Sequence, residues 1–481
     1  MNSLKCYADI KSKHSDESLL LFTNIKHYLR LMLLIFICSS SELLFAEEYI
    51  VKTTDNLQQI LDKSSDGDII TLNSGKYLGN FVITKQITLR GTEGSIIDAH
   101  GKGHALTLKN SNITINNLNI INWGNDLTKQ SSGIYSNEKV EVNSDKKKAV
   151  GLVISNNTLS GDGFGIWLNN VNTANVFNNT IKGNLTIRSA DRGNGIQVAN
   201  VTNSHVFNNE IYNVRDGIYV ISSQNNLIKA NTMHHLRYGI HYMYSYDNTV
   251  KDNIAYNTRA GYALMSSRRL TITGNKTTDS EDYGFLLNFI TQSTFTNNYV
   301  KNVWTKAENK VLGRDGKGLF VYNSGYNTLE NNIIDTAEIG IHLTAGSENI
   351  KIYGNSFINN PTQVKYVSNK KQEWSKEGRG NYWSNYLGWD MNNDGIGDAI
   401  FEPNDGIDKL VWQYPEMKII MDSPAILILR WVQKQFPVLK PPGVKDSYPL
   451  MAPHFSQDNV SRKQHTITSD VEPESLQEEK L

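Results

Sequence analysis

A glycine-centred repeat of 22 residues constrains the fold more than any other feature of this sequence. Apolar runs begin at Gly195, Gly217, Gly239 and Gly261, each 22 residues after the previous one. A unit this short holds only two or three strands of about five residues and cannot bury an apolar face alone, so consecutive units must stack. Strand-sized runs without a helical period therefore predict an all-β fold, a right-handed parallel β-helix with coils of 22 residues. Related runs begin at Gly165, Gly284, Gly318 and Gly340.

Two faces and a polar ladder follow from this repeat. The residues one and three positions after each glycine are apolar, so the alternation of a strand turns them inward, and the residues two and four positions after it face outward. A second series, Asn209, Asn231, Asn253 and Asn275, keeps the same spacing. We expect these asparagines to form a ladder in which each amide bonds to the backbone of a tight corner and to the asparagine of the next coil.

The first 46 residues are typical of an export signal. Basic residues precede an apolar run over 31–38, and a small-residue end lies at Ala46, so we expect cleavage there and a periplasmic mature protein. The chain's two cysteines, Cys6 and Cys38, fall in this segment, which leaves the mature chain without a thiol. The 48 basic and 48 acidic residues balance, so overall charge gives no reason to expect nucleic acid as a partner.

The repeat ends near residue 370, which divides the exported chain into three parts. The β-helix is predicted over 47–370, an Asp-rich loop and a transporter-docking segment over 371–453, and a polar, acidic tail over 454–481. The apolar stretch 410–439 is interrupted by Asp, Pro and Arg. This favours a hairpin of short helices that meets a membrane or a membrane protein over a helix that spans a bilayer. The candidate docking residues of the hairpin are Met417, Met421 and Trp431.

The outward row of the glycine-centred strands is apolar and aromatic and carries no carboxylate. Such a stripe on a sheet surface is typical of a groove or of a surface that binds a partner. The alternative is that a loop or the C-terminal segment covers it. The candidate partner-docking residues in this row are Trp167, Tyr219, Phe320, Tyr322 and His342.

A possible set of metal ligands lies within the same row. His241 and Met243 are two residues apart on one strand face, and Met265 follows Met243 on the next coil, about 4.8 Å away. Imidazole and thioether without thiolate is a ligand set that suits Cu(I). The alternative is that these side chains make ordinary surface contacts. The candidate copper ligands also include the preceding residues Met233, His234 and His235.

Three arginines, Arg215, Arg237 and Arg259, each stand two residues before a glycine of the repeat. Stacking would bring their guanidinium groups about 4.8 Å apart, where like charges repel, so an anion or an acidic partner is expected there. The alternative is neutralisation within the chain by Asp216, Glu281 and Asp282.

Residues 390–398 have the spacing of an EF-hand-like calcium loop, with oxygen ligands at positions 1, 3, 5, 7 and 9 and Gly395 at position 6. Phe401 stands at position 12, where the bidentate glutamate of such a loop is missing. The alternative is a loop rich in Asx turns that holds no ion. The candidate calcium ligands are Asp390, Asn392, Asp394, Asp398 and the carbonyl of Ile396.

Three stretches resemble a known family. They are Arg-Tyr-Gly-Ile-His-Tyr-Met-Tyr-Ser from Arg237, Gly-Asn-Tyr-Trp-Ser-Asn-Tyr-Leu-Gly-Trp-Asp-Met-Asn-Asn-Asp-Gly-Ile-Gly-Asp from Gly380, and Leu-Arg-Trp-Val-Gln-Lys-Gln-Phe-Pro from Leu429. Together they are similar to the NosD family of nitrous-oxide reductase maturation proteins, over roughly residues 49–451. The resemblance implies a periplasmic, non-enzymatic β-helix subunit that sits on an ABC transporter made of a cytoplasmic ATPase and a membrane permease. It also implies a part in copper supply, through a lipoprotein copper chaperone, to nitrous-oxide reductase.

The residues themselves leave a second function open, the binding or modification of an anionic polysaccharide by a lyase or an epimerase. Such an enzyme needs acid and base groups in its groove. A carboxylate that reaches the outward row from a neighbouring coil would therefore favour it. The function predicted first is copper delivery without catalysis, with copper as a transient ligand and calcium as a possible structural ion.

Overall fold

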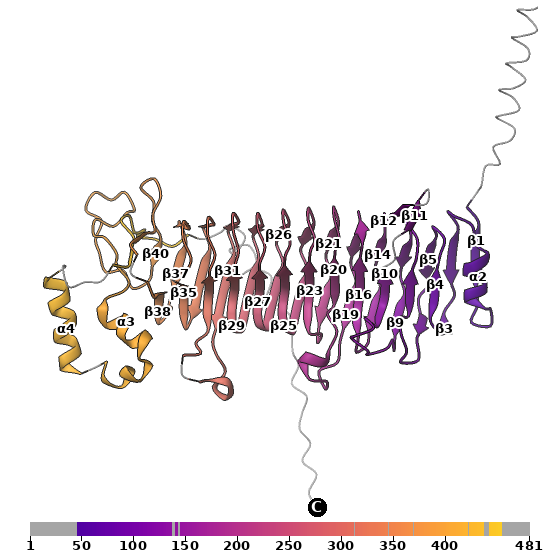
Figure 1. The fold of residues 1–481 in the computed structure, drawn as a ribbon, viewed down its shortest axis with the longest axis horizontal. Coiled ribbons are helices and arrows are strands. Elements are labelled where there is room, and N and C mark those ends of the chain that lie inside the picture. The colour runs from indigo at the N-terminus through magenta and orange to yellow at the C-terminus, as the bar shows by residue number, and fades with distance from the viewer. Residues whose placement is uncertain are drawn as a thin grey trace, which may run out of the picture. The chain divides into compact units, whose positions relative to one another are not determined.

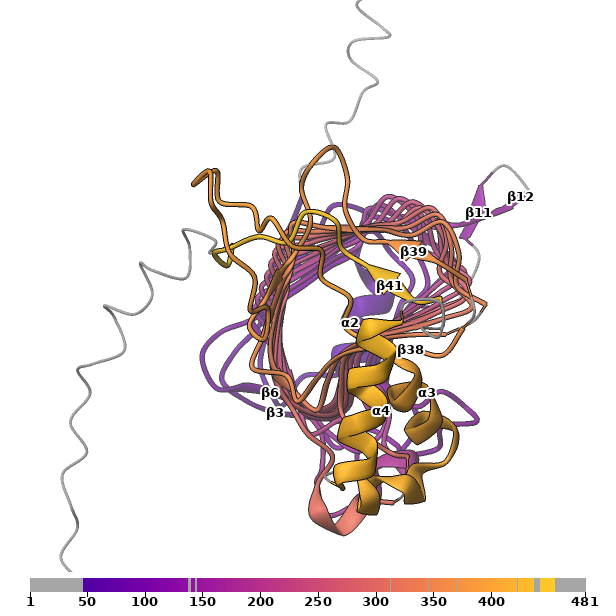
Figure 2. The same cartoon turned by 90° about the vertical axis from the view of Figure 1, so that its left-hand side faces the viewer.

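The computed structural model describes residues 46–454 except 137–139, 143–144, 312, 345, 369, 422 and 437–441. Within this part, short parallel strands repeat coil after coil along one axis. Figure 1 shows the solenoid from the side, and Figure 2 shows it down this axis. The predicted parallel β-helix is confirmed. The predicted signal peptide and acidic tail lie outside the described residues, apart from Ala46 and His454 at their borders.

One face of the solenoid is a parallel sheet of 13 strands. Each strand pairs with the equivalent strand of the previous and the next coil, for example Thr249 with both Leu227 and Thr271. Its members are β1 (Glu48–Val51), β2 (Ile69–Leu72), β5 (Thr88–Gly91), β8 (Thr114–Asn116), β14 (Val153–Ser155), β18 (Asn175–Phe177), β21 (His205–Phe207), β24 (Leu227–Lys229), β26 (Thr249–Lys251), β28 (Thr271–Thr273), β30 (Thr294–Thr296), β33 (Thr328–Glu330) and β36 (Lys351–Tyr353).

The other two faces join into a second sheet, because three long strands bend around the corner between them. The long strands are β25 (Thr232–Met243), β27 (Ile254–Met265) and β29 (Lys276–Asn288). The face before the corner contains β3 (Gly75–Leu78), β6 (Ser95–Asp98), β9 (Asn119–Ile121), β15 (Thr158–Ser160), β19 (Thr180–Lys182), β22 (Glu210–Tyr212), β31 (Tyr299–Val303), β34 (Ile333–Ala337), β37 (Ser356–Ile358) and β40 (Tyr382–Trp383). The glycine-centred face contains β4 (Phe81–Ile83), β7 (Leu106–Leu108), β10 (Ser132–Ser136), β16 (Phe164–Asn169), β20 (Ile196–Ala199), β23 (Asp216–Ile221), β32 (Lys317–Tyr322), β35 (Ile339–Leu343) and β38 (Thr362–Tyr366).

Several short strands and 3-10 helices lie outside the two large sheets. The insertions that lengthen two repeats hold the 3-10 helices η1 and η2, and Figure 1 shows both on the side of the solenoid where α3 lies. Parallel pairing continues to β40, beyond the boundary predicted at residue 370. Apart from the α-helices and η3, which are described below, the remaining elements are η1 (Ser189–Asp191), η2 (Ala307–Asn309), β11 (Val140–Val142), β12 (Asp145–Lys147), β13 (Ala149–Val150), β17 (Val171–Asn172), β39 (Gln372–Glu373) and β41 (Val444–Lys445).

The interior is filled by the residues one and three positions after each glycine. Ile218, Val220, Ile240 and Tyr242 are all fully buried, as alternation predicts. Aromatic rings also stack from coil to coil inside, with the rings of Tyr262 and Phe285 4.4 Å apart. Because each coil buries its apolar face only against its neighbours, stability in such a solenoid comes from these contacts between coils.

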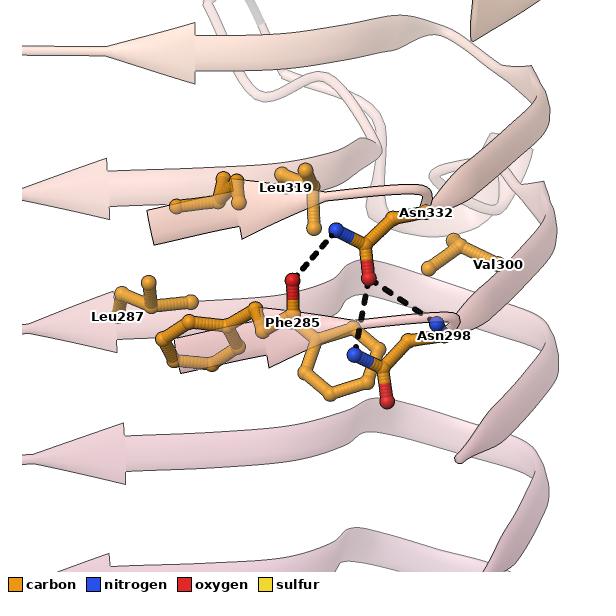
Figure 3. A pocket seen from close by; sticks show the side chains of 8 residues that line it. Phe285, Leu287, Asn298, Val300, Leu319 and Asn332 are labelled. Atoms are coloured by element: carbon orange, nitrogen blue, oxygen red, sulfur yellow. Dashed lines mark hydrogen bonds between the residues drawn. The ribbon is translucent and has the colours of Figure 1, made fainter. Parts of the chain in front are cut away.

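The predicted asparagine ladder is present and is longer than expected. Each side-chain amide donates to the Oδ1 of the asparagine one coil on, as for Asn298 and Asn332 at 2.9 Å in Figure 3, beside a cavity of about 10 Å³. The same Oδ1 accepts the backbone N–H of Asn298 at 3.0 Å, so it satisfies two donors in the corner. Both insertions leave the ladder unbroken. Its members are Asn157, Asn179, Asn209, Asn231, Asn253, Asn275, Asn298, Asn332, Asn355 and Asn381.

The glycine of each repeat marks a close approach of two backbones. A Cβ on Gly239 would lie 2.5 Å from the carbonyl oxygen of Gly261 and 2.8 Å from the Cβ of Ala255. The neighbouring Gly217 has the same relation to the carbonyl oxygen of Gly239, also at 2.5 Å. These distances are far inside van der Waals contact, so only glycine allows the coils to stack at this position.

Replacing Gly239 with alanine is therefore expected to lower the free energy of unfolding by about 2–3 kcal/mol, because the new methyl group forces adjacent backbones apart. Chemical denaturation followed by circular dichroism measures this change. Gly443→Ala is the matched control, since a Cβ there would meet none of the described residues within 4 Å. Equal effects of the two substitutions would contradict the close-approach explanation.

Both ends of the solenoid are covered. At the first coil, helix α2 (Leu57–Lys63) buries Leu57 and Leu61, and the Asn56 side chain caps it by accepting the backbone N–H of Gln59. At the last coil, the chain returns after residue 442 and places Asp446 beneath the last member of the ladder. Asp446 Oδ2 accepts the indole N–H of Trp383 at 2.8 Å and the backbone N–H of Asn381 at 2.7 Å. Burial raises the pKa of this carboxyl to about 6.

The predicted apolar hairpin follows the last coil. It consists of α3 (Gly406–Gln413), the 3-10 helix η3 (Pro415–Ile420) and α4 (Pro424–Gln435). Arg430 of α4 donates to the carboxylates of Asp405 and Asp408 at the start of α3, which ties the two helices together. The Nζ of Lys409 donates to the carbonyl of Ser368 at 2.6 Å, so the hairpin is anchored to the segment that follows the last coil.

Candidate metal site

The glycine-centred strands bring the predicted ligands of the outward row into register. Tyr219 of β23 lies beside His241 of β25, and Met243 of β25 lies beside Met265 of β27. Met243 and Met265 are both half-buried. The sequence-based expectation that His241, Met243 and Met265 gather on neighbouring coils agrees with this register.

His241 is held by a buried carboxylate. Its Nδ1 lies 3.0 Å from Asp216 Oδ2, and Arg237 donates to both oxygens of Asp216, at 2.9 Å and 2.7 Å. Burial opposes charge on Asp216, but the hydrogen bonds from His241 and Arg237 outweigh it and hold the pKa of this carboxyl below its ordinary value. Because the ionised carboxylate only accepts, Nδ1 of His241 is the donor, and in the neutral imidazole the lone pair then lies on Nε2.

Tyr219 joins the histidine to the thioether. Its ring stacks on the His241 ring with centroids 4.3 Å apart, and its hydroxyl donates to Met243 Sδ at 3.0 Å. Tyr238 contacts the other side of His241 edge-on, with centroids 5.2 Å apart. The imidazole is thus fixed on two sides and is only 7% exposed.

The Nε2 atom of His241 is buried and has no hydrogen-bond partner in the structure. A histidine whose Nδ1–H is bound by a carboxylate and whose Nε2 is unpartnered has the arrangement common to metal-binding histidines. Across the described residues, no three histidine, cysteine or carboxylate side chains gather as a metal cage. A metal bound at His241 would therefore depend on thioether sulfur for its other protein ligands, which suits a soft ion such as Cu(I).

The structure removes Met233 from the predicted set of copper ligands. Its side chain is fully buried in the core, where it packs beneath Gly217. The reason is alternation along β25, which turns Met233 inward between two outward neighbours. The prediction that Met233 contacts copper is wrong for this inward orientation.

His234 and His235 belong to a different row from His241. The ring of His234 is stacked between Tyr212 and Tyr256, at centroid distances of 4.9 Å and 4.7 Å. The Nδ1 atoms of the two histidines are 2.8 Å apart, so one ring donates to the other. Burial and the neighbouring charge of His235 lower the pKa of His234. The two rings therefore satisfy each other before the corner of β25, while His241 lies after it.

Two of the three arginines form hydrogen-bonded pairs with carboxylates within the chain, as the alternative interpretation held for all three. Arg237 pairs with Asp216, and Arg259 Nε donates to Asp282 Oδ2 at 2.5 Å. Arg215 Nε donates to Asn194 Oδ1 at 3.3 Å. The carboxylate of Asp282 also accepts from Arg314 of the second insertion, at 3.0 Å. At Arg237 and Arg259 these carboxylates take the place of an external anion, whereas Arg215 donates to a neutral amide.

In the loop over 390–398, the side-chain carboxylates accept hydrogen bonds from backbone N–H groups. Asp390 accepts the N–H groups of Asp394 at 3.2 Å and Gly395 at 2.8 Å, and Asp394 accepts that of Ile396 at 2.8 Å. Asp398 in turn accepts the N–H of Met391 at 2.7 Å. This is the loop rich in Asx turns, in which each of the three carboxylates already accepts a hydrogen bond from the backbone.

The aromatic docking candidates lie in one outward row, in two groups. Trp167 packs edge-on against Phe164 at 4.7 Å, and its buried indole nitrogen has no hydrogen-bond partner among the described residues. Further along, the Phe320 ring lies 4.9 Å from His342, and Tyr322 is 41% exposed. Burial, together with the charges of Lys365 and Lys317, lowers the pKa of His342 to about 3, so this ring is neutral at ordinary pH.

The helical hairpin exposes an unusual amount of apolar surface. Ile419 is 90% exposed, Ile428 61% and Trp431 60%, while Met417 and Met421 are half-buried. Large contiguous apolar patches are rare on free soluble proteins and mark sites of interaction with proteins or membranes. None of the helices in the described residues is long and apolar enough to span a membrane. The exposed apolar side chains of the hairpin are Leu410, Tyr414, Ile419, Ile420, Leu427, Ile428, Leu429, Trp431 and Phe436.

Asp216 belongs to the site because it binds His241, whereas the sequence predicted it only as a partner for an arginine. It stands 25 residues before His241, and the 22-residue period could have placed it beside Tyr238, three residues before the histidine. It is also a carboxylate at the edge of the outward row, the feature that would favour a polysaccharide enzyme. However, it is fully buried, and its oxygens accept from Arg237 and His241, so it cannot serve a substrate as a general base.

Comparison with known proteins gives the family. A family model described as "Periplasmic copper-binding protein (NosD)" matches residues 177–388. A protein of Pseudomonas aeruginosa named "Probable ABC transporter binding protein NosD" is 52% identical over 390 residues, which cover 80% of this chain and 89% of the relative. A relative of the same name from Stutzerimonas stutzeri is 50% identical over 383 residues, which cover 79% of this chain and 86% of the relative.

Among solved structures, the A-module of the mannuronan C-5 epimerase AlgE6 from Azotobacter vinelandii aligns with a TM-score of 0.48 at 12% identity, over 62% of this chain and 87% of the module. At this level of similarity, the alignment carries no argument about activity. The sequence relatives, in contrast, align over nearly their whole length and are identical to this chain at about half of the aligned positions. The chain therefore belongs to the NosD family of periplasmic copper-binding proteins.

Proposed function

We propose that this chain works in the periplasm as a subunit of an ABC transporter complex, where it binds Cu(I) in transit and takes part in the maturation of nitrous-oxide reductase. It does so as a binding protein and not as an enzyme. Its family is described as periplasmic and copper-binding, and its relatives are named ABC transporter binding proteins. The expected export signal over residues 1–46 supports the same compartment.

The copper site of this proposal consists of His241, Met243 and Met265. The observation that carries it is the buried Nε2 of His241, which lacks a hydrogen-bond partner while Nδ1 is held by a carboxylate. An unpaired buried nitrogen costs free energy, and a bound metal ion would recover it. Copper is here the cargo, and because the residues Met243 and Met265 are only half-buried, the bound ion would stay open to exchange with a partner.

Two surfaces would serve the partners. The exposed apolar side of the hairpin is suited to the membrane permease, which in turn connects to the cytoplasmic ATPase. The outward aromatic row, which includes Trp167, Tyr219 and Phe320, is suited to the protein partners that exchange copper, a lipoprotein copper chaperone and nitrous-oxide reductase. Aromatic and methionine side chains are enriched in such interfaces.

Cu(I) binding by the purified protein tests the copper site. The full chain would carry Cys6→Ser and Cys38→Ser, so that no thiol competes for the metal, and would be titrated anaerobically against a chromogenic Cu(I) chelator. We expect about one equivalent of Cu(I) to bind. His241→Gln and Met243→Leu should each weaken the affinity at least about tenfold, because each removes one of only a few ligands.

Matched substitutions control for general effects of losing an imidazole or a thioether. His205 lies exposed on β21, and Met391 is 84% exposed in the loop over 390–398, so His205→Gln and Met391→Leu should leave the affinity unchanged. If the unsubstituted protein does not compete with the chelator, or if the control variants weaken binding equally, the outward row is not a copper site.

A further inference from the structure

We propose that Asp216 is the positioning residue of the copper site: it holds His241 in the tautomer protonated at Nδ1 and so keeps the lone pair of Nε2 available to Cu(I). The inference rests on the proposed function for its metal, but the tautomer itself can be measured without copper. Asp216 would touch the ligand and not the metal, so its role is indirect.

The geometry ties the carboxylate in place from two sides. Arg237 donates from Nε and Nη2 to the two oxygens of Asp216 in a bidentate pair, and one of these oxygens lies 3.0 Å from Nδ1 of His241. The guanidinium of Arg237 is in turn seated over the Tyr238 ring, 4.4 Å from its centroid. Such outer partners fix the tautomer and orientation of a metal-binding histidine and raise its basicity.

The fold itself does not require a carboxylate at this position. Asp216 pairs in register with Tyr238, and the same row continues on the following coils with neutral or cationic residues in place of an acid. A buried ionised group is costly unless it has partners, so a purely structural position would be better served by an apolar residue. The residues of the row, in order, are Asp216, Tyr238, Ala260, Tyr283, Lys317 and Ile339.

A second histidine supplies an internal comparison. His342 stands two residues after its glycine, as His241 does, and the position one residue before the preceding glycine is Lys317, where His241 has Asp216. The Nδ1 of His342 has no hydrogen-bond partner in the structure, and its ring contacts Phe320. The next outward residue is Thr344, where His241 is followed by Met243. His241 is thus accompanied by a carboxylate on the preceding coil and a thioether on its own strand, whereas His342 has Lys317 and Thr344 at these two positions.

Histidine-selective ¹⁵N labelling tests the proposal directly. In the full chain with Cys6→Ser and Cys38→Ser, the His241 signals, assigned by their loss in His241→Gln, should show a single tautomer with the proton on Nδ1. In Asp216→Asn, which keeps the shape of the side chain, we expect a mixture of tautomers or the reverse one. Cu(I) affinity should fall about 10- to 100-fold in the same variant.

Two further variants separate positioning from folding. Asp282→Asn removes another buried carboxylate, which accepts from Arg259 and Arg314 and contacts no histidine among the described residues, so it should leave both the tautomer of His241 and the affinity unchanged. Asp216→Glu keeps the charge and should recover part of the affinity lost in Asp216→Asn. Circular dichroism and unchanged His342 signals establish that each variant is folded.

The outcomes distinguish this inference from the proposed function. An unchanged His241 tautomer and unchanged affinity in Asp216→Asn would overturn the positioning role, as would an equal loss in Asp282→Asn. If the unsubstituted protein binds no Cu(I), the proposed function fails. The tautomer of His241 in the metal-free protein then still decides whether Asp216 positions the ring.

Discussion

Replacing Asn253 with alanine should lower the free energy of unfolding by about 4 kcal/mol, a larger effect than most single substitutions produce. The Asn253 side chain is fully buried and makes five hydrogen bonds. Its Oδ1 accepts from the backbone N–H and the side-chain amide of Asn231, at 3.0 Å and 2.9 Å. Its Nδ2 shares two hydrogens among three acceptors, the carbonyls of Ile228 and Lys251 and Asn275 Oδ1, at 2.9, 3.0 and 3.0 Å.

The size of this effect follows from what the substitution leaves behind. A methyl group cannot satisfy the N–H of Asn231 or the carbonyl of Ile228, and each buried polar group without a partner costs about 1–3 kcal/mol. Because each rung holds the next, the loss should also open neighbouring coils to hydrogen exchange.

Chemical denaturation and amide hydrogen exchange measure the change. The control is Asn175→Ala, since Asn175 faces outward on β18, whose central residue Val176 is the buried one. Loss of similar stability in both variants would mean that the ladder contributes nothing beyond an ordinary asparagine.

Most of the solenoid could be predicted because its periodicity is local and repeated. The spacing of the glycines gave the coil length, the alternation gave the inward residues such as Ile240, and the regular asparagines gave the ladder. The reason for the glycines, a carbonyl oxygen 2.5 Å from where a Cβ of Gly239 would lie, is a contact between coils and needed coordinates. The last rung at Asn381 was missed because an irregular segment of the chain separates it from the repeat.

The candidate site was predicted only in part, because the direction in which its side chains point depends on the corner within the long strand β25. The register of Met243 with Met265 follows directly from the 22-residue period. The assignment of Met233 failed because the corner of β25 reverses which residues face outward. The contact between Asp216 and His241 was missed because it joins residues 25 apart, three more than one full coil.

Many apolar side chains of the hairpin are exposed in the described part of the chain. In α4, Ile426 is buried, whereas Leu427, Ile428, Leu429 and Trp431 are all largely exposed. The hairpin is nevertheless well held, since Ser423 caps α4 and Arg430 binds both acidic residues at the start of α3. A surface that is apolar, exposed and rigidly presented has low ordering cost on binding, which favours a high-affinity contact.

The triple substitution Leu427→Glu, Ile428→Glu and Trp431→Glu should therefore abolish binding to the transporter's permease, with a loss of affinity of at least about 1000-fold, or 4 kcal/mol. Buried tryptophan and aliphatic anchors carry most of the energy of an interface, and glutamate at their positions would bring unpaired charge into it. Binding of the purified chain to the permease in lipid nanodiscs measures the effect, and the unfolding transition should not change because the three side chains are exposed.

Leu387, Trp389 and Met391 are comparably exposed apolar residues outside the hairpin, so their triple glutamate variant is the matched control. Loss of binding in the control with retention in the hairpin variant would move the docking surface to the loop over 390–398, and equal retention in both would remove the hairpin from the interface altogether.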